Sequence, residues 1–324
     1  MSTRPIFIGL DVGGTRLKGG AIDASGKVLA RAVEPTAPGQ SLRAFEKQLD
    51  ALIARLVAEV GPAFTLAGIG ASITGPVDPE VGCVYLPGKI RGLDRHKTVP
   101  YLRKRWRVPV TADNDGRLAC YAEWKAGAGR GIDNLLVFTL GTGIGSGVVL
   151  DGRLLTDRHF QRGTQCGHFV IDLNGPRCLT GALGTGESLS SVTALVQDVR
   201  SALARGLPLA LAEDKPAHEI MFPDIIEAVR KKDPLVTEIF ERWLDRFAAV
   251  VLNSFYAYTP DLILLAGGPT KAAPLFLKKL NTRLETTAFR VPVGYPIPLR
   301  VAALGEDAGW IGGALRIQEL SSCA

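Results

Sequence analysis

The sequence predicts an α/β protein of two lobes, because strand-like and helix-like segments alternate along the chain and a glycine-rich loop between two strands occurs twice. The first loop follows the apolar segment at residues 6–10, and the second follows residues 134–140. The length of 324 residues suits two domains of ordinary size. We therefore expect a duplicated chain in which two lobes share a cleft.

The first half of the chain has three apolar segments of strand length, at residues 6–10, 18–23 and 28–33. Ser41 is a favourable N-cap, and apolar residues at spacings of three and four follow it as far as Gly61, which predicts a helix. Further strands are expected at residues 66–73 and 108–112, and a helix at about 117–125.

The second half repeats the opening pattern, with strands expected at residues 134–140 and 148–155 around a glycine turn at 141–147. A long apolar stripe predicts a helix from Pro234 to about Phe255. Strands follow at residues 262–265 and around Val301, and the last helix is expected at 310–320. We place the N-terminal lobe at residues 1–118, completed by about 305–324, and the C-terminal lobe at 119–304.

The charge of the chain is basic but does not decide its function. A net charge of +6 could attract nucleic acid, polyphosphate or an anionic substrate, and its densest segment is Arg103-Lys104-Arg105-Trp106-Arg107. We interpret that segment as a solvated helix end. Five scattered cysteines at no framework spacing, with no secretory or membrane segment, favour a reduced, cytoplasmic protein. His96, His159 and His218 have no motif context and are expected at the surface.

The first glycine loop has the residue types that bind phosphate. Glycines let backbone N–H groups approach phosphate oxygens, a hydroxyl adds a donor, and a carboxylate could hold Mg²⁺ through water. The candidates are Asp11, Gly13, Gly14, Thr15 and Lys18. The alternative is an ordinary β-turn with glycine at positive φ.

A second set of glycines strengthens the phosphate interpretation, because one loop alone is equally typical of a turn. The candidates are Gly141, Thr142, Gly143 and Gly145 in the second loop, and Gly267 and Gly268 after an apolar strand. Two such loops on two halves of the chain, together with Gly267 and Gly268, predict that the chain binds phosphate.

Five motifs occur in the order found in the ROK sugar kinases, which belong to the actin-like ATPase superfamily. They are Asp11-Val12-Gly13-Gly14-Thr15, Gly75-Pro76-Val77-Asp78, Asn114-Asp115, Leu140-Gly141-Thr142-Gly143-Ile144-Gly145 and Gly167-His168. The chain resembles this family from residue 8 to about 315. The resemblance implies a two-lobed actin-like (ribonuclease H-like) ATPase fold with an interdomain cleft.

The resemblance also implies a glucokinase-like activity, the ATP- and Mg²⁺-dependent phosphorylation of a hexose hydroxyl, the 6-hydroxyl in particular. Asp115 matches the family's general base, and Asn114 matches the residue that orients the sugar. Phosphoryl transfer depends mostly on positioning and charge neutralisation, which one carboxylate can complete by taking the hydroxyl proton. The alternative for Asp115 is a helix N-cap. Gly75, Gln165, His168 and Glu187 match the sugar site, with Gln165 standing where the family has a glutamate.

The chain departs from the family at a structural zinc site. The family holds zinc with one histidine and three cysteines, but here Thr180 and Thr185 stand at two of the cysteine positions. Hydroxyls are poor zinc ligands beside thiolates, so we expect no structural zinc. A residual site of Cys166, His168 and Cys178 stays open as an alternative. Without zinc, His168 needs another partner, for which Thr180 and Thr185 are candidates.

Three other functions stay open at this point. A polyphosphate-dependent glucokinase would also suit a basic chain without the cysteine cluster. A sugar-responsive regulator would need a DNA-binding domain, and only five residues precede the first strand. A non-catalytic sugar sensor would not require Asp115. We expect a small-molecule sugar as partner, a homodimer, and neither nucleic acid nor membrane.

Overall fold

The computed structural model describes most of the chain: residues 3–36, 41–79, 82–84, 93, 95–156, 162–207, 215–289 and 297–322. The chain divides into two compact units. Unit 1 comprises Met1–Gly131, Gly147–Thr164 and Ala303–Ala324, and unit 2 comprises Ile132–Ser146 and Gln165–Ala302. The predicted lobe boundary at about residue 118 stays a prediction.

The first sheet has five strands in the order β3-β2-β1-β4-β7. Its strands are β1 (Arg4–Val12), β2 (Arg16–Asp23), β3 (Val28–Pro35), β4 (Phe64–Ile73) and β7 (Val110–Asn114). The β1–β2 and β2–β3 pairs are antiparallel, whereas β4 runs parallel to both β1 and β7. A short hairpin of β5 (Val77–Asp78) and β6 (Cys83–Val84) lies after β4 in the chain.

The second sheet repeats this order, as β10-β9-β8-β11-β12. Its strands are β8 (Leu135–Leu140), β9 (Ile144–Leu150), β10 (Arg153–Leu154), β11 (Leu262–Ala266) and β12 (Leu299–Val301). The matching orders confirm the predicted α/β class and fit a duplicated chain. One boundary was wrong: β9 begins at Ile144 rather than 148, so the loop ends at Gly143 and Gly145 lies within a strand.

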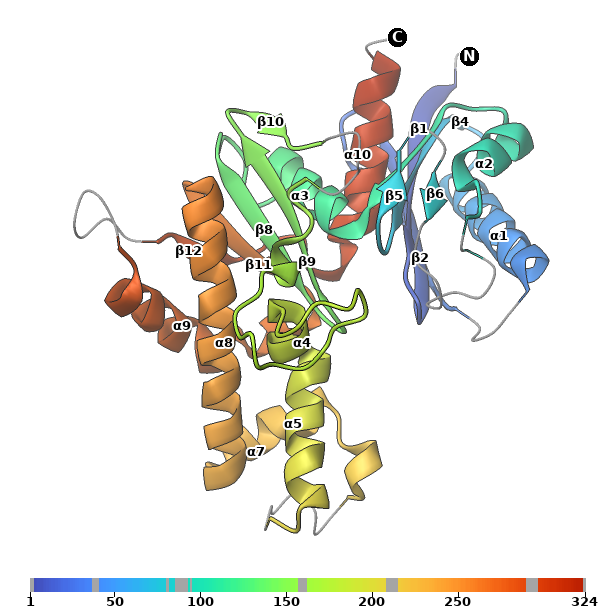
Figure 1. The fold of residues 1–324 in the computed structure, drawn as a ribbon. Helices are drawn as coiled ribbons and strands as arrows, with labels where there is room; N and C mark the ends of the chain where they lie inside the picture. The colour runs from blue at the N-terminus through green and yellow to red at the C-terminus, as the bar shows by residue number, and fades with distance from the viewer. Residues whose placement is uncertain are drawn as a thin grey trace. The chain divides into compact units, whose positions relative to one another are not determined.

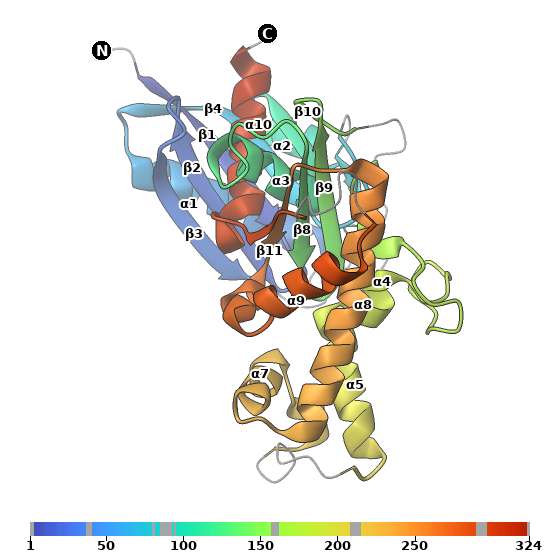
Figure 2. The same cartoon turned by 90° about the vertical axis from the view of Figure 1, so that its left-hand side faces the viewer.

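Helices cover both faces of the first sheet. Alternate residues of β1 point to opposite faces, and Ile6, Ile8 and Leu10 join an apolar cluster with α1 (Leu42–Val60). Phe7 packs instead with Trp310 of α10 (Ala308–Ser322). Figure 2 shows α10 passing across the sheet beside β1. The predicted Ser41 cap of α1 is observed, since its side chain accepts a hydrogen bond from the backbone N–H of Ala44.

The C-terminal helix approaches the first sheet more closely than a side chain on Gly70 would allow. A Cβ atom on Gly70 would lie 1.8 Å from the carbonyl oxygen of Gly313. This close contact explains why two glycines face each other between β4 and α10. It also attaches the last segment of the chain to the N-terminal strands within unit 1.

Unit 2 is largely helical outside its strands. The helices in its described residues are α4 (Gly186–Ser190), α5 (Val192–Ala204), α7 (Phe222–Arg230), α8 (Pro234–Tyr258) and α9 (Ala273–Thr287). In Figure 1, α5 and α7 lie beside the lower part of the long helix α8. Of these, only α8 was predicted. No helix in the described part of the chain is long and apolar enough to cross a membrane.

The basic segment forms the end of α2 (Thr98–Trp106), with Arg103, Lys104 and Arg105 in its last turn. This agrees with a helix end, where positive charge is favourable. The surface prediction for His96 was wrong: its side chain is 7% exposed and contacts Glu46 and Thr98. His218 is exposed, and His159 lies outside the described residues.

Candidate active site

The turn from β7 into α3 (Asp115–Ala126) brings together three predicted sugar-site residues of unit 1. The Nδ2 of Asn114 donates to the Gly75 carbonyl oxygen at 2.9 Å and to the Oδ1 of Asp115 at 3.0 Å. The backbone N–H of Gly116 donates to the same Oδ1 at 2.9 Å. Gly75 has φ of 103°, in the region that favours glycine. The Asp115 carboxylate is therefore held in one orientation by two donors.

The cap of α3 is Asn114 and not Asp115. The Asn114 side chain accepts from the backbone N–H of Arg117 at 3.1 Å, and Asp115 is the first residue of the helix. The N-cap alternative for Asp115 was therefore wrong. A carboxylate in the first turn is still favoured by the helix dipole.

A buried ion pair joins Asp113, which precedes this turn, to Arg117, which follows it. Arg117 Nη1 lies 2.5 Å from Asp113 Oδ1, and Arg117 Nη2 donates to the Arg162 carbonyl oxygen at 3.2 Å. Asp113 Oδ1 also accepts from the Asn114 N–H at 2.7 Å. Burial raises the pKa of Asp113, and the charge of Arg117 opposes that rise. This pair was not predicted, although a carboxylate and an arginine stand four residues apart in the sequence beside Asn114 and Asp115.

Asp11, at the end of β1, lies in the same unit. Its Oδ2 is 3.4 Å from Lys18 Nζ on β2, and Ser72 Oγ on β4 lies 3.4 Å from its Oδ1. The pKa of Asp11 is raised to about 6, chiefly by burial and also by the nearby Asp115 carboxylate, while the charge of Lys18 opposes the rise. Two predicted residues, Asp11 and Asp115, are thus close enough for their charges to interact. Ser72 was missed.

The first glycine loop is held at its base and open at its tip. The N–H of Gly13 donates to the Arg16 carbonyl oxygen at 3.1 Å, and Thr36 Oγ1 donates to the Gly13 carbonyl oxygen at 3.0 Å. Gly14 and Thr15 are exposed. A turn with this geometry leaves the Gly14 and Thr15 segment accessible to a ligand.

The second glycine loop is attached to the start of α5 in unit 2. The N–H of Val192 donates to the Gly141 carbonyl oxygen at 3.0 Å, and Thr193 Oγ1 donates to that of Thr142 at 2.8 Å. A Cβ atom on Gly267 would lie 2.0 Å from the Leu140 carbonyl oxygen, so the Gly267-Gly268 turn directly adjoins this loop. The predicted glycines of unit 2 therefore lie together in these two adjoining turns, except for Gly145, which belongs to β9.

The predicted sugar-site residues of unit 2 lie on two short elements next to that loop. His168 ends the 3₁₀ turn Cys166–His168, Gln165 immediately precedes it, and Glu187 lies in the first turn of α4. The N–H of Gly186 donates to the Phe169 carbonyl oxygen at 2.8 Å, which joins the two elements. Glu187 Oε2 accepts from the Ile144 N–H at 2.8 Å.

His168 does not have the partner expected for it. Its Nδ1 is buried, and it has no hydrogen-bond partner among the residues that the structure describes. Thr180 Oγ1 lies 3.0 Å from Cys178 Sγ instead, and Thr185 Oγ1 pairs with Ser188. The expectation that Thr180 or Thr185 would bond His168 was therefore wrong.

The residues at the family's zinc position do not fit zinc. Burial would raise the pKa of the Cys178 thiol, but hydrogen bonds from Thr180 and Thr185 lower it below its usual range. Cys166 is buried, and burial raises the pKa of its thiol. Within the described ranges, no group of three His, Cys, Asp or Glu side chains is placed to hold a metal ion. Zinc needs four good ligands, and a thiol bonded to two hydroxyls supplies one.

Comparison with known proteins gives one family. The ROK family model matches residues 7–319. The chain is 29% identical to a glucokinase of Halalkalibacterium halodurans, covering 97% of this chain and 95% of that one. It is 29% identical to a glucokinase of Thermotoga maritima, covering 97% of both. Among solved structures, a ROK hexokinase of Thermus thermophilus is 26% identical with a TM-score of 0.80, covering 98% of this chain and 100% of that one.

Proposed function

The chain belongs to the ROK family, and from this premise we propose that it is a carbohydrate kinase that transfers the γ-phosphoryl group of ATP to a hexose hydroxyl. The observation that carries the proposal is the placement of Asp115. Its carboxylate is oriented by Asn114 Nδ2 and by the Gly116 N–H, at the start of a helix in the unit that also contains Asp11. The glucokinase names of two relatives support the same reaction class.

Asp115 would act as the general base. It accepts the proton of the sugar hydroxyl as the oxygen attacks the γ-phosphorus, and the bond from that phosphorus to the bridging oxygen of ADP breaks. Two hydrogen bonds to one carboxylate oxygen fix the plane of the group before the sugar binds. A general base of this kind typically contributes ~10²–10⁴ in rate. Asn114 orients the Asp115 carboxylate, and its hydrogen bond to the Gly75 carbonyl oxygen also holds the turn that follows β4.

The residues near Asp11 fit Mg²⁺. This ion prefers oxygen ligands, keeps several waters, and is usually held by one or two carboxylates together with substrate phosphates. Asp11 supplies a carboxylate, Ser72 adds a hydroxyl 3.4 Å from it, and the nearby charge of Asp115 makes the position more negative. Bound there, the ion would neutralise charge on the phosphates. Lys18, which lies 3.4 Å from Asp11, would counter the same charge from the protein side.

The two glycine loops are proposed as phosphate-binding segments. Gly13, Gly14 and Thr15 offer N–H groups and a hydroxyl in an accessible turn. Gly141, Thr142 and Gly143 form a loop attached to α5, with Gly267 and Gly268 beside it. ATP is the donor we propose. Polyphosphate remains the second candidate, because it presents the same phosphate oxygens to the same N–H groups.

The acceptor is proposed to be glucose or a related hexose, phosphorylated at its 6-hydroxyl. His168 and Glu187 would contact sugar hydroxyls, and Gln165 would supply one acceptor and one donor where a carboxylate has acceptors only. We further propose a cytoplasmic homodimer. A non-catalytic sensor is disfavoured by the oriented Asp115 carboxylate, which sugar binding alone would not require.

A coupled assay tests the proposal. Purified protein is incubated with Mg-ATP or Mg-polyphosphate and a panel of hexoses and hexosamines, and the phosphorylated carbon is located by ³¹P–¹H NMR. We expect turnover of glucose with ATP and a 6-phosphate product. Turnover with polyphosphate but not with ATP would identify polyphosphate, rather than ATP, as the phosphoryl donor. Absence of turnover with every sugar, despite measurable nucleotide binding, would favour the sensor.

A further inference from the structure

Glu187, a proposed sugar contact, is bonded to the glycine loop that is proposed to bind phosphate. Its Oε2 accepts the backbone N–H of Ile144 at 2.8 Å, at the point where the loop enters β9. Both residues belong to unit 2. The Glu187 carboxylate therefore contacts the second glycine loop through one oxygen. Its remaining acceptor positions can accept hydrogen bonds from sugar hydroxyls.

The contact is built into the packing of the loop. A Cβ atom on Gly143 would lie 2.3 Å from Glu187 Oε2. Any other residue at position 143 would therefore displace the carboxylate or the loop. Gly143 leaves the space that the Glu187 side chain occupies, so the two residues form one fitted unit.

The rest of the loop is attached to the same short segment of chain. Val192 and Thr193 are the first residues of α5, separated from α4 by Ser191 alone, and they bond the carbonyl oxygens of Gly141 and Thr142. These two contacts do not involve a proposed sugar residue. Among the described contacts between this segment and the loop, the one made by Glu187 alone involves a residue that is also proposed to bind the sugar.

We propose that Glu187 couples the two substrates: it positions the glycine loop as well as the sugar, so that bound sugar raises the affinity for nucleotide. This inference rests on the proposed kinase function. Hydrogen bonds from sugar hydroxyls to the remaining acceptor positions of Glu187 would hold its carboxylate where it accepts the Ile144 N–H, and so would stabilise the glycine loop in this arrangement. By linkage, the nucleotide raises sugar affinity by the same factor.

Calorimetry of the full-length protein tests the coupling. The affinity for Mg-AMPPNP, a non-hydrolysable ATP analogue, is measured with and without saturating glucose. For the unmodified protein we expect glucose to tighten AMPPNP binding about fivefold or more, the lower end of typical coupling. Glu187→Gln, which leaves one acceptor oxygen for two donors, should reduce this factor to below twofold.

Two matched variants separate coupling from general effects. Ser188→Ala changes the neighbouring residue of α4, whose hydroxyl bonds Thr185 rather than the loop, and should keep the full factor. Thr193→Val removes a loop contact that the sugar does not share, so it should weaken AMPPNP binding but keep the factor. If Glu187→Gln does not fold, Glu187→Asp withdraws the carboxylate by one methylene and should lose the coupling too.

The outcomes distinguish this inference from the proposed function. If the unmodified protein phosphorylates glucose but binds AMPPNP equally well with and without it, the coupling is overturned and the kinase stands. Full coupling in a folded Glu187→Gln or Glu187→Asp also overturns it. If the unmodified protein neither turns over any sugar nor binds glucose and AMPPNP, both proposals fail.

Discussion

At the scale of single residues, Asp11 makes a prediction about pH. Its pKa is raised from 3.8 to about 6, chiefly by burial and also by the charge of Asp115. The folded state therefore binds this proton more tightly, so the contribution of Asp11 to stability is full below pH 3.8 and is lost as the pH rises through about 6. Activity has the opposite trend, since the ionised carboxylate is proposed to act. We expect kcat/KM for ATP to fall as the pH is lowered through about 6.

The assignment of that acid limb can be checked with magnesium. Protons and Mg²⁺ would compete for Asp11, so raising the Mg²⁺ concentration should move the limb to lower pH. Asp11→Asn should lower activity and remove the magnesium dependence of the limb. A limb that stays in place in a pH–rate profile at all Mg²⁺ concentrations would contradict the role of Asp11.

Arg117 gives a second prediction, because its removal leaves the buried Asp113 without its ion-pair partner. Losing one member of a buried pair typically costs about 3–5 kcal/mol. Arg117→Met should therefore lower the free energy of unfolding by that amount in urea titrations. The double variant Asp113→Asn with Arg117→Met removes both charges, keeps an acceptor for the Asn114 N–H, and should recover more than half of the loss. No recovery would mean that the pair is not the source of the effect.

At the scale of elements, Glu123 joins the end of α3 to the chain segment that leads into α10. It is fully buried, and its carboxylate accepts the N–H groups of Ala128, Ala303 and Leu304 at 2.9, 3.1 and 2.7 Å. Glu123→Gln keeps one acceptor and turns an amide N–H₂ toward other donors. We expect a loss of about 3 kcal/mol, since each hydrogen bond to a charged group contributes about 1.5–3 kcal/mol. The exposed Glu59→Gln should change thermal unfolding little.

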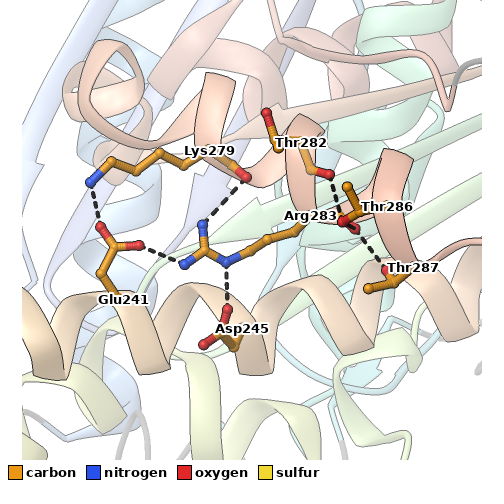
Figure 3. Close-up of polar contacts among 7 residues, drawn as sticks. All are labelled: Glu241, Asp245, Lys279, Thr282, Arg283, Thr286 and Thr287. Atoms are coloured by element: carbon orange, nitrogen blue, oxygen red, sulfur yellow. Dashed lines mark hydrogen bonds and ion pairs between the residues drawn. The ribbon is translucent and has the colours of Figure 1, made fainter.

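Helices α8 and α9 are joined by a cluster of charges that Figure 3 shows in detail. Arg283 of α9 bonds Glu241 and Asp245 of α8, each at 2.5 Å, and Lys279 also pairs with Glu241. Arg283→Met should lower stability by about 1 kcal/mol, and the loss should shrink in 1 M salt because the pairs are partly exposed. Lys278→Met, an exposed neighbour on the same helix, is the control. An equal loss in high salt would show that packing, not charge, joins the helices.

Element prediction from the sequence succeeded where a local rule was strong. The Ser41 cap and the three-and-four spacing located α1, and the stripe after Pro234 located α8. It failed at β9, because the glycines at positions 145 and 147 favour a turn although they lie in a strand. Helices α4, α5, α7 and α9 were missed, since no element was predicted between residues 155 and 234 or between Gly268 and the strand around Val301.

The candidate site was predictable in its residues but not in its contacts. The motifs placed Asn114, Asp115 and Gly75 in one site, and the structure brings these three together. The Asp113–Arg117 pair and the bond from Glu187 to Ile144 depend on tertiary packing that no motif encodes. The unpartnered Nδ1 of His168 was missed for the same reason.

At the scale of the whole molecule, the duplication explains why two glycine loops exist. The two sheets have the same strand order, and each loop joins the two strands at corresponding places, β1 to β2 and β8 to β9. The loops differ in what holds them. Thr36 bonds the first, whereas Val192, Thr193 and Glu187 bond the second. The two halves of the chain thus hold their glycine loops by different attachments.

The variant Asp115→Asn tests the proposed role of Asp115 as the general base of a sugar kinase. Asparagine keeps an oxygen that can accept from Asn114 Nδ2 and the Gly116 N–H, so the turn should persist while the base is lost. The measurement is kcat for phosphoryl transfer to glucose, with glucose and AMPPNP affinities determined on the same preparation. We predict a fall in kcat of ~10²–10⁴ with affinities nearly unchanged. A variant that keeps the original kcat would show that Asp115 is not the general base.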